Sequence, residues 1–404
     1  MFKITNHFFN TNNRSYFITA LILFTVFLSY YFLILYLRIG TDIQIHASIA
    51  WSFFINDDSI APNFLYYFLV ALTAGFSKYK IAYYAASIII LSLAVVFKYF
   101  LNFFYINKYL PWIQRKEVIG LSISLLFIFC LPNIDFFKQI DFKHKIFYLG
   151  QLAPNVWHNS TIIFLFPFAI LLFFKSYELL YADKFNKNLQ WQIFILILLN
   201  ALIKPSFLFT VIPAVLFLFC LKVVNGNNQK ISIIKTIPFI AGSFFIGIEY
   251  FIIYRLNYSS KVMSAIDDSK VILSPFEVWS HFSTNIPVAI ITSCFFPIVY
   301  IFFTGGRILK NKLVLFSALN FVFGVCIWIF FAESGFRKFH GNFYWQVVIT
   351  IYLFFFSLLL HFINSVKANE LSKIKQAFIA GAFILHLLWG IFYWLKIIIF
   401  KGYS

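Results

Sequence analysis

An acid and an imidazole stand together where the first long apolar segment of the chain ends. Asp42 and His46 lie in residues 40–46 (GTDIQIH), directly after the apolar run 16–37. Residues four apart share one face of a helix, so the two side chains would point the same way in a helical stretch. A carboxylate at this level can act as a general base on a substrate arriving from outside the lipid. The same pattern is also typical of a solvated loop after a first membrane helix.

The residues after Asp42 have the pattern of an amphipathic helix. Two series recur at a spacing of four, the polar Gln44, Ser48, Ser52 and Asn56 and the apolar Ile45, Ile49 and Phe53. Such a pattern predicts a helix lying flat at the membrane surface. Residues 63–76 are apolar but short for a full crossing, which indicates a second interfacial or re-entrant helix. We therefore predict a first outer loop over residues 38–80 that contains two surface helices.

Three more polar clusters interrupt the apolar sequence, at 154–161 (PNVWHNST), 204–206 (KPS) and 333–343 (ESGFRKFHGNF). Each follows or precedes a long apolar run, at the end that we predict to face outward. We therefore expect the clusters to meet Asp42 and His46 at one membrane face. Their candidate substrate-binding residues are Trp157, His158, Asn159, Lys204, Glu333, Arg337, His340 and Asn342.

Each cluster also has a purely structural interpretation. Asn159 or Ser160 would make a good N-cap for the apolar run that follows. Lys204, beside a proline that ends a helix, is suited either to snorkelling at a membrane interface or to binding a phosphate. Arg337 and Lys338 are also typical of interfacial anchors. The density of charged and amide groups around Arg337, in so apolar a chain, favours function there.

The composition determines the class of protein. Hydrophobic residues make up 62% of the chain and charged residues only 11%, with a mean hydropathy of +0.86. Several apolar runs reach the ~20 residues that a membrane-spanning helix needs. We predict an all-α polytopic membrane protein, with residues 1–404 forming one integral membrane domain and no soluble domain. The net charge of +18 comes from scattered lysines, which indicates a membrane protein and not a nucleic-acid-binding one.

We predict eleven spans, at residues 16–37, 81–104, 117–132, 161–181, 190–203, 207–224, 237–254, 286–303, 313–332, 343–363 and 377–399. Lys3 and Arg14 place the amino terminus inside by the positive-inside rule. Keeping residues 63–76 outside assigns four basic residues to the cytoplasm, Lys98, Lys108, Arg115 and Lys116. The resulting topology predicts a multi-pass protein of a bacterial inner membrane with its polar clusters on the periplasmic face.

The sequence gives little support to a metal or a soluble cofactor. Asp42, His46, His158, Glu333 and His340 are possible ligands for a divalent metal, but only the first two have a close spacing. The four cysteines fall inside apolar runs and suggest neither a disulfide framework nor a metal cluster. No glycine-rich phosphate loop or dinucleotide fingerprint is present. We therefore predict no metal and no cofactor.

Taken together, these features resemble the GT-C superfamily of integral membrane glycosyltransferases. The resemblance rests on a first span ending in an acid, surface helices in the first outer loop, ten or more spans and chemistry at the outer face. It implies a polyprenyl-phosphate sugar donor and a catalytic base at Asp42. The superfamily often has an acidic pair in this loop, and the second acid here would be Asp57 or Asp58, or be replaced by His46. By size, the glucosyltransferases that modify O-antigen in bacterial lipopolysaccharide are the nearest functional type.

The resemblance transfers a role only to the acid of the first loop, and we add a role for each of the other clusters. Asp42 would deprotonate the acceptor hydroxyl, and Lys204 and Arg337 would hold the leaving phosphate. His46, His158 and Asn342 would orient the donor or the acceptor. The expected partners are the polyprenyl-phosphate sugar, a glycan or lipid-linked acceptor and membrane lipid, with no nucleic acid.

Two other functions remain open on the sequence. A transporter or flippase of lipid-linked saccharide would place polar groups near the middle of the bilayer, often between repeated halves. Glu249 lies inside a predicted span, where a polar group is usually functional, but the halves of this chain do not match. An O-antigen polymerase or an acyltransferase would also place its chemistry near a membrane face.

Overall fold

The computed structural model describes residues 14–56, 62–133, 148–182, 184–224, 229–254 and 270–402. Lys3 and the two candidate second acids, Asp57 and Asp58, lie outside these residues.

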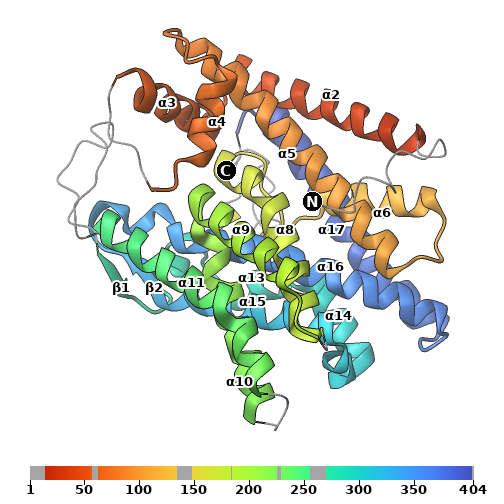
Figure 1. Cartoon of the computed structure of the whole chain (residues 1–404). Helices are drawn as coiled ribbons and strands as arrows, with labels where there is room; N and C mark the ends of the chain where they lie inside the picture. The colour runs from red at the N-terminus through yellow and green to blue at the C-terminus, as the bar shows by residue number, and fades with distance from the viewer. Residues whose placement is uncertain are drawn as a thin grey trace.

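The described chain is mostly helical (Figure 1). Its α-helices are α2 (Arg14–Tyr36), α3 (Asp42–Ile55), α4 (Leu65–Thr73), α5 (Lys80–Tyr109), α6 (Arg115–Phe127), α8 (Ser160–Tyr181), α9 (Lys187–Ile203), α10 (Leu208–Val224), α11 (Gln229–Tyr254), α12 (Glu277–Phe282), α13 (Ile286–Ser293), α14 (Phe295–Thr304), α15 (Lys312–Phe330), α16 (Trp345–Lys367) and α17 (Lys373–Ile399). Short 3-10 turns connect several of them, η2 (Tyr148–Gly150), η3 (Pro205–Phe207), η5 (Gly305–Lys310), η6 (Gly335–His340) and η7 (Asn342–Tyr344).

The described residues contain fewer candidate membrane spans than the eleven that the sequence predicted. Among the described residues, eight helices are long and apolar enough to cross a bilayer, or nine if the bent pair α13 and α14 forms one span. This confirms a polytopic helical membrane protein but not the count of eleven. The expected spans 117–132 and 190–203 correspond to α6 and α9, whose 13 and 17 residues fall short of the usual ~20. The expected span 286–303 is bent by 72° at its break.

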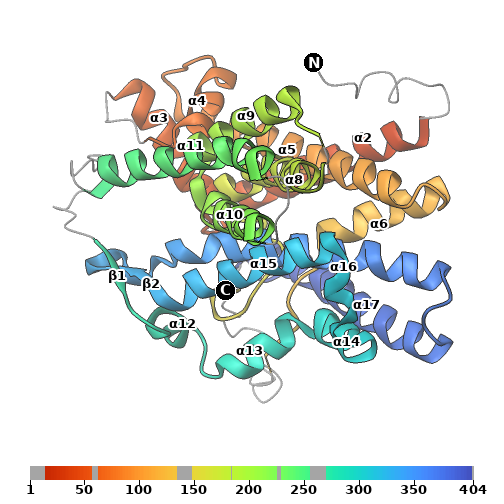
Figure 2. The same cartoon turned by 60° about the horizontal axis from the view of Figure 1, so that its bottom comes forward.

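The two helices predicted in the first loop are present, and both pack against α5. α3 begins at Asp42, and Thr41 and Gln44 form a capping box at its N-terminus. Ile43, Ala47 and Phe53 are buried, whereas Ile45 is 56% exposed, so the buried face only partly matches the predicted apolar series. Figure 2 shows α3 and α4 at one end of the bundle, together with the small sheet, and the α5–α6 and α16–α17 connections at the other end.

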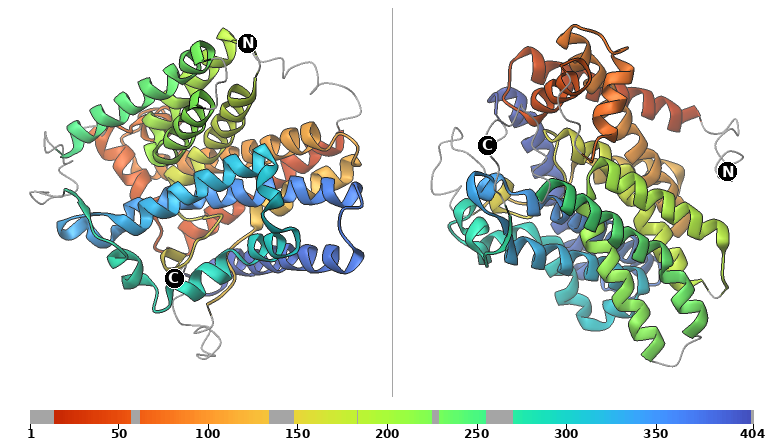
Figure 3. Two further views of the ribbon diagram at one scale, coloured as in Figure 1. Left: turned by 90° about the horizontal axis from the view of Figure 1, so that it is seen from below. Right: turned by 60° about the vertical axis from the view of Figure 1, so that its left-hand side comes forward.

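α8 and α16 form the centre of the bundle. They are the most deeply buried of the candidate spans, and α15 packs along α16 (Figure 3). Phe173 of α8 stacks on Phe316 of α15 at 4.9 Å between ring centroids. The side chain of Asn159 caps α8 by accepting a hydrogen bond from the backbone of Ile162 at 3.1 Å. This confirms the predicted N-cap and fixes the polar end of α8.

A two-stranded sheet interrupts the helical architecture, and the sequence analysis missed it. β1 (Val271–Leu273) pairs antiparallel with β2 (Phe331–Glu333), with Val271 opposite Glu333. Each strand has three residues, too few to produce a recognisable alternating pattern. The pairing holds the chain where it leaves α15 and thereby fixes Glu333.

Candidate functional site

Four polar side chains from three regions of the chain form a continuous hydrogen-bonded series. The amide of Asn159 donates to Oδ2 of Asp42 at 2.6 Å. The hydroxyl of Thr161 donates to Oδ1 of Asn159 at 3.0 Å, and Nζ of Lys204 donates to the hydroxyl of Thr161 at 3.3 Å. We call this series the Asp42–Lys204 relay. It joins the start of α3, the start of α8 and the link between α9 and η3, as the sequence analysis expected for three of its four clusters.

The two charged ends of the relay have shifted pKa values. Burial raises the pKa of Asp42, while the hydrogen bond from Asn159 and the charge of Lys204 act in the opposite direction. Burial lowers the pKa of Lys204 to about 8, and the charges of Asp42 and Glu333 oppose that change. The carboxyl is therefore a stronger base than in water, and the amine is still mostly protonated at neutral pH.

The fourth cluster gathers around Glu333, the last residue of β2, which is only 3% exposed. Its Oε1 accepts hydrogen bonds from the hydroxyl of Tyr254 at 2.6 Å and from Nη1 of Arg337 at 3.2 Å. Its Oε2 accepts a hydrogen bond from the amide of Asn342. Glu333 thus ties the end of α11 to η6 and η7, which places Arg337 and Asn342 beside it.

Lys204 connects this cluster to the relay. Its Nζ lies 4.8 Å from the ring centroid of Trp345, the first residue of α16. Trp345 directly follows η7, which carries Asn342. The charge of Glu333 is close enough to Lys204 to oppose part of the lowering of its pKa by burial. All four polar clusters therefore meet around Lys204. Trp345 and Tyr254 belong to this site and were not among the predicted residues, because both stand at the ends of apolar runs and look like membrane-interface aromatics.

His46 lies on the same helix as Asp42 but has a different partner. Its Nδ1 forms a hydrogen bond with the hydroxyl of Tyr67 in α4 at 2.7 Å. Burial, reinforced by the positive charge of Lys204, lowers the pKa of His46 to about 3. The imidazole is therefore neutral at physiological pH, and Asn159 occupies the position beside Asp42 that a paired histidine would take.

Two more of the predicted residues, Trp157 and His158, are buried. The buried ring of His158 lies 4.4 Å from that of Tyr148, and Tyr148 in turn lies 6.1 Å from Trp345. Burial lowers the pKa of His158 to about 3. Trp157 packs in the core against Phe129 and Tyr393.

His340 stands apart from the other predicted residues. It is exposed, and its ring contacts Phe336 at 5.5 Å. Within the described ranges, no hydrogen bond or ring contact joins His340 to the relay. The structure therefore brings His158 toward the site through Tyr148, but not His340.

Lys98 corrects one part of the predicted topology. It was assigned to the cytoplasm, yet it is buried inside α5, and its Nζ donates to Oδ1 of Asn155 at 2.6 Å. The rings of Phe166 and Tyr352 enclose the same ammonium, at 3.4 and 3.9 Å to their centroids. Lys98 thus anchors the segment that leads to Asn159. The apolar residues on both sides of Lys98 belong to one long helix, α5, which contains this lysine as a buried cation.

Metal ligands do not gather in the part of the chain that the structure describes. No group of three or more His, Cys, Asp and Glu side chains there is close enough to hold an ion. The predicted absence of a metal stays a prediction. Comparison with known proteins gives no match to any protein-family model, curated protein or solved structure. The interpretation of the site therefore rests on its own chemistry.

Proposed function

We propose that this chain is a GT-C-type membrane glycosyltransferase. It would transfer a sugar from a polyprenyl-phosphate donor to a glycan or lipid-linked acceptor, such as O-antigen, at the periplasmic face of a bacterial inner membrane. The observation that carries the proposal is the Asp42–Lys204 relay. It holds a carboxylate and an ammonium together at the start of the first loop helix, where this reaction needs a base and a phosphate-binding cation.

Asp42 would act as the general base. The amide of Asn159 donates a hydrogen bond to Oδ2 of Asp42, and none of the described residues donates one to Oδ1 of Asp42. We assign Oδ1 to the acceptor hydroxyl, which would lose its proton as its oxygen attacks the anomeric carbon. The raised pKa of Asp42 supports this role, because proton transfer is most effective when the pKa of the base approaches the working pH.

Lys204 would hold the phosphate that leaves with the polyprenyl chain. Negative charge grows on that phosphate as its bond to the sugar breaks, and a fixed cation stabilises this charge in the transition state. Arg337 would assist as a second cation, although it shares its charge with Glu333. His46, His158 and Asn342 would orient the sugars, and Trp345 offers an aromatic face beside Lys204.

The charges at the opposite end of the bundle support the orientation that we propose. α8 and α9 carry site residues at one end, whereas Lys175, Lys184 and Lys187 lie toward the other. The positive-inside rule then assigns that basic end to the cytoplasm. In a cysteine-free background, a cysteine at exposed Lys78 should react with an impermeant thiol reagent in spheroplasts, whereas one at exposed Lys310 should react only after lysis.

A transporter of lipid-linked saccharide is the second candidate. Broken helices and buried charges inside spans favour it. The pair α13 and α14 is bent by 72°, and Lys98 and Glu249 are buried within α5 and α11. An O-antigen polymerase or an acyltransferase remains a further alternative for the same membrane-face site.

Glycan analysis of bacterial strains separates these functions. Surface polysaccharide and lipid-linked precursors would be compared by mass spectrometry in the intact strain, the deletion strain and a strain expressing Asp42→Asn at normal level. The transferase predicts loss of one sugar residue in both altered strains. Accumulation of precursor on the cytoplasmic side would instead identify a transporter, and chains of normal composition but reduced length would identify a polymerase.

A further inference from the structure

Lys98 is a buried cation to which the proposed reaction assigns no role. It lies within α5, a candidate membrane span, and is only 6% exposed. An ionisable side chain inside a span is costly to bury and usually has a function. The groups that contact its ammonium are Asn155, Phe166 and Tyr352, from three parts of the chain. These contacts indicate what the cation holds in place.

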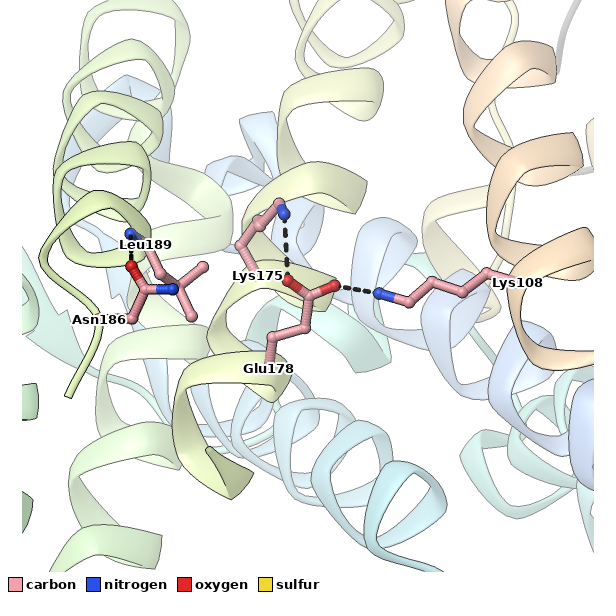
Figure 4. Close-up of polar contacts among 5 residues, drawn as sticks. All are labelled: Lys108, Lys175, Glu178, Asn186 and Leu189. Atoms are coloured by element: carbon pink, nitrogen blue, oxygen red, sulfur yellow. Dashed lines mark hydrogen bonds and ion pairs between the residues drawn. The ribbon is translucent and has the colours of Figure 1, made fainter. Parts of the chain in front are cut away.

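A second lysine of α5 has the surroundings expected at the end of a span. Lys108 lies in the last turn of α5 and is exposed. It pairs with Glu178 of α8, which Lys175 also contacts at 3.0 Å (Figure 4). Such a surface pair contributes little to stability. Lys98 differs from Lys108 in having an amide and two aromatic rings around it in the interior.

The hydrogen bond from Lys98 sets the orientation of the Asn155 amide. Nζ of Lys98 donates to Oδ1 of Asn155 at 2.6 Å. The amide nitrogen therefore points the other way, where it donates to the backbone oxygens of Leu125 at 3.2 Å and Ile128 at 2.8 Å. A hydrogen bond from an ammonium is stronger than one between neutral groups. Lys98 thus fixes the segment around Asn155 to the end of α6.

The contacts of Lys98 lie on both sides of Asn159, the residue that donates to Asp42. Asn155 belongs to the loop before Asn159, and Phe166 belongs to α8, which Asn159 caps. The ring centroid of Phe166 is 3.4 Å from the ammonium. At a rise of ~1.5 Å per residue, Phe166 is roughly 10 Å along α8 from Asn159. One cation therefore holds both the loop before Asn159 and the helix after it.

Tyr352 extends the contacts of Lys98 to α16. Its ring centroid lies 3.9 Å from the ammonium, and its hydroxyl donates to Oδ1 of Asn102 at 2.6 Å. α16 begins at Trp345, whose ring lies beside Lys204. Lys98 thus connects α8 and α16, the two helices whose first turns contact the Asp42–Lys204 relay.

We propose that Lys98 is a positioning residue for the general base Asp42. Through Asn155 and the start of α8, it would hold the amide of Asn159 where that amide donates to Oδ2 of Asp42. It acts through Asn159 and not on the substrate. This inference rests on the proposed function, because it assigns Lys98 a role in the same site.

The pH dependence of sugar transfer in Lys98→Met tests the proposal. Methionine is unbranched but has no charge and no donor. Loss of the bond from Asn159 should raise the pKa of Asp42, so the acid limb should move to higher pH, as in Asn159→Ser. The other titratable groups that act on Asp42 are unaltered, namely Lys204 and Tyr67. Turnover should fall by roughly tenfold to a hundredfold, since a misplacement of ~1 Å can cost about 10²-fold. The KM for the donor should stay unchanged, because Lys204 is retained.

The double variant Lys98→Met/Asn159→Ser shows whether Lys98 acts through Asn159. If it does, the acid limb should move no further than in Asn159→Ser alone, because the same bond is already lost. Additive shifts would overturn the proposal. A normal acid limb in Lys98→Met with a shifted one in Asn159→Ser would also overturn it, while leaving Asp42 as the base. No shift in any of these variants would remove Asp42 as the base, and the role of Lys98 with it.

The matched control is Lys108→Met, which removes a lysine from the same helix without altering the contacts of Lys98. Its acid limb and turnover should be normal, since Glu178 retains Lys175. If Lys98→Met does not fold, Asn155→Leu removes the same hydrogen bond from its other partner, and the same outcomes decide.

Hydrogen exchange of the full-length protein in detergent gives a readout that does not depend on the reaction. Lys98→Met should exchange the backbone amides of residues 155–163 faster than Lys108→Met does, because the segment around Asn159 is held less firmly. Equal exchange in the two variants would show that Lys98 does not hold this segment, and the proposal would be wrong whatever the reaction is.

Discussion

Glu333 is a buried carboxylate and Asp42 a half-buried one; both act on the charge of Lys204, but they have different surroundings. Glu333 accepts hydrogen bonds from Tyr254, Arg337 and Asn342, which engage both of its oxygens. Asp42 accepts one from Asn159, and among the described residues its second oxygen has no donor. A carboxylate with both oxygens engaged holds structure together, whereas one with a vacant oxygen can take a proton. The comparison favours Asp42 as the base and Glu333 as the residue that fixes its surroundings.

Replacing Asp42 should have the largest effect on turnover. Asp42→Asn keeps the size of the side chain but removes the proton acceptor, so we expect turnover to fall by ~10² to 10⁴. The purified variant should retain its melting temperature in detergent. Sugar transfer from a polyprenyl-phosphate donor measures the rate. Transfer at the normal rate would remove Asp42 as the base and with it the main support for the GT-C interpretation.

Replacing Glu333 should affect stability more than chemistry. Glu333→Ala leaves Arg337 without this counter-charge, and because Arg337 is only partly buried, the cost should stay below the ~3–5 kcal/mol typical of a fully buried ion pair. Thermal unfolding in detergent should show a clear fall in melting temperature. A suitable control is Glu277→Ala, because Glu277 forms an exposed ion pair with Lys338, and such pairs contribute little. If Glu333→Ala were as stable as this control but inactive, the roles assigned to the two acids would be reversed.

The sequence predicted the local features of the site better than its long-range contacts. The N-cap at Asn159 and a helix that contains both Asp42 and His46 follow from residues close to each in the sequence, and both are confirmed. The hydrogen bond between them joins residues 117 positions apart. The expectation that the helix ends carrying the polar clusters meet was right, but the pairing of Asp42 with Asn159 depends on the packing of α3 against α8.

Two features escaped the sequence analysis for different physical reasons. Lys98 was assigned to a cytoplasmic end because a lysine usually marks the end of a span. Its charge is instead held inside the bundle by Asn155 and two aromatic rings, which come from distant segments. The pairing of β1 with β2 depends on strands of three residues each, which are too short to give a periodic signal.

Lys204 provides a smaller test that depends on pH. Lys204→Ala should raise the KM for the donor by roughly tenfold to a hundredfold, the usual contribution of a hydrogen bond to a charged group. It should also slow turnover, because the charge on the phosphate grows in the transition state. In the unaltered protein, the pKa of Lys204 is about 8. Phosphate binding requires the protonated amine, so donor affinity should be complete well below pH 8 and decrease as the pH rises through that value.

The matched variant for this test is Lys204→Arg, because arginine stays protonated throughout this range. Its KM for the donor should be independent of pH on the alkaline side. An unaltered alkaline profile in Lys204→Arg would show that another group titrates there, and Lys204 would then lose its assignment as the phosphate-binding cation.

The smallest expected effect concerns Asn159 and separates its two roles. Asn159 caps α8 through Oδ1 and donates to Asp42 through Nδ2. Serine is also a good N-cap but has no amide donor, so Asn159→Ser should keep the melting temperature. Loss of the donated hydrogen bond should raise the pKa of Asp42, because that bond favours the ionised carboxylate. The acid limb of the rate profile, where Asp42 becomes protonated, should therefore move to higher pH.

Asn159→Ala should show the same shift together with a loss of about 1 kcal/mol in stability. An acid limb that does not move in either variant would mean that Asp42 does not control the rate, and the contrast between Asp42 and Glu333 would have no catalytic meaning.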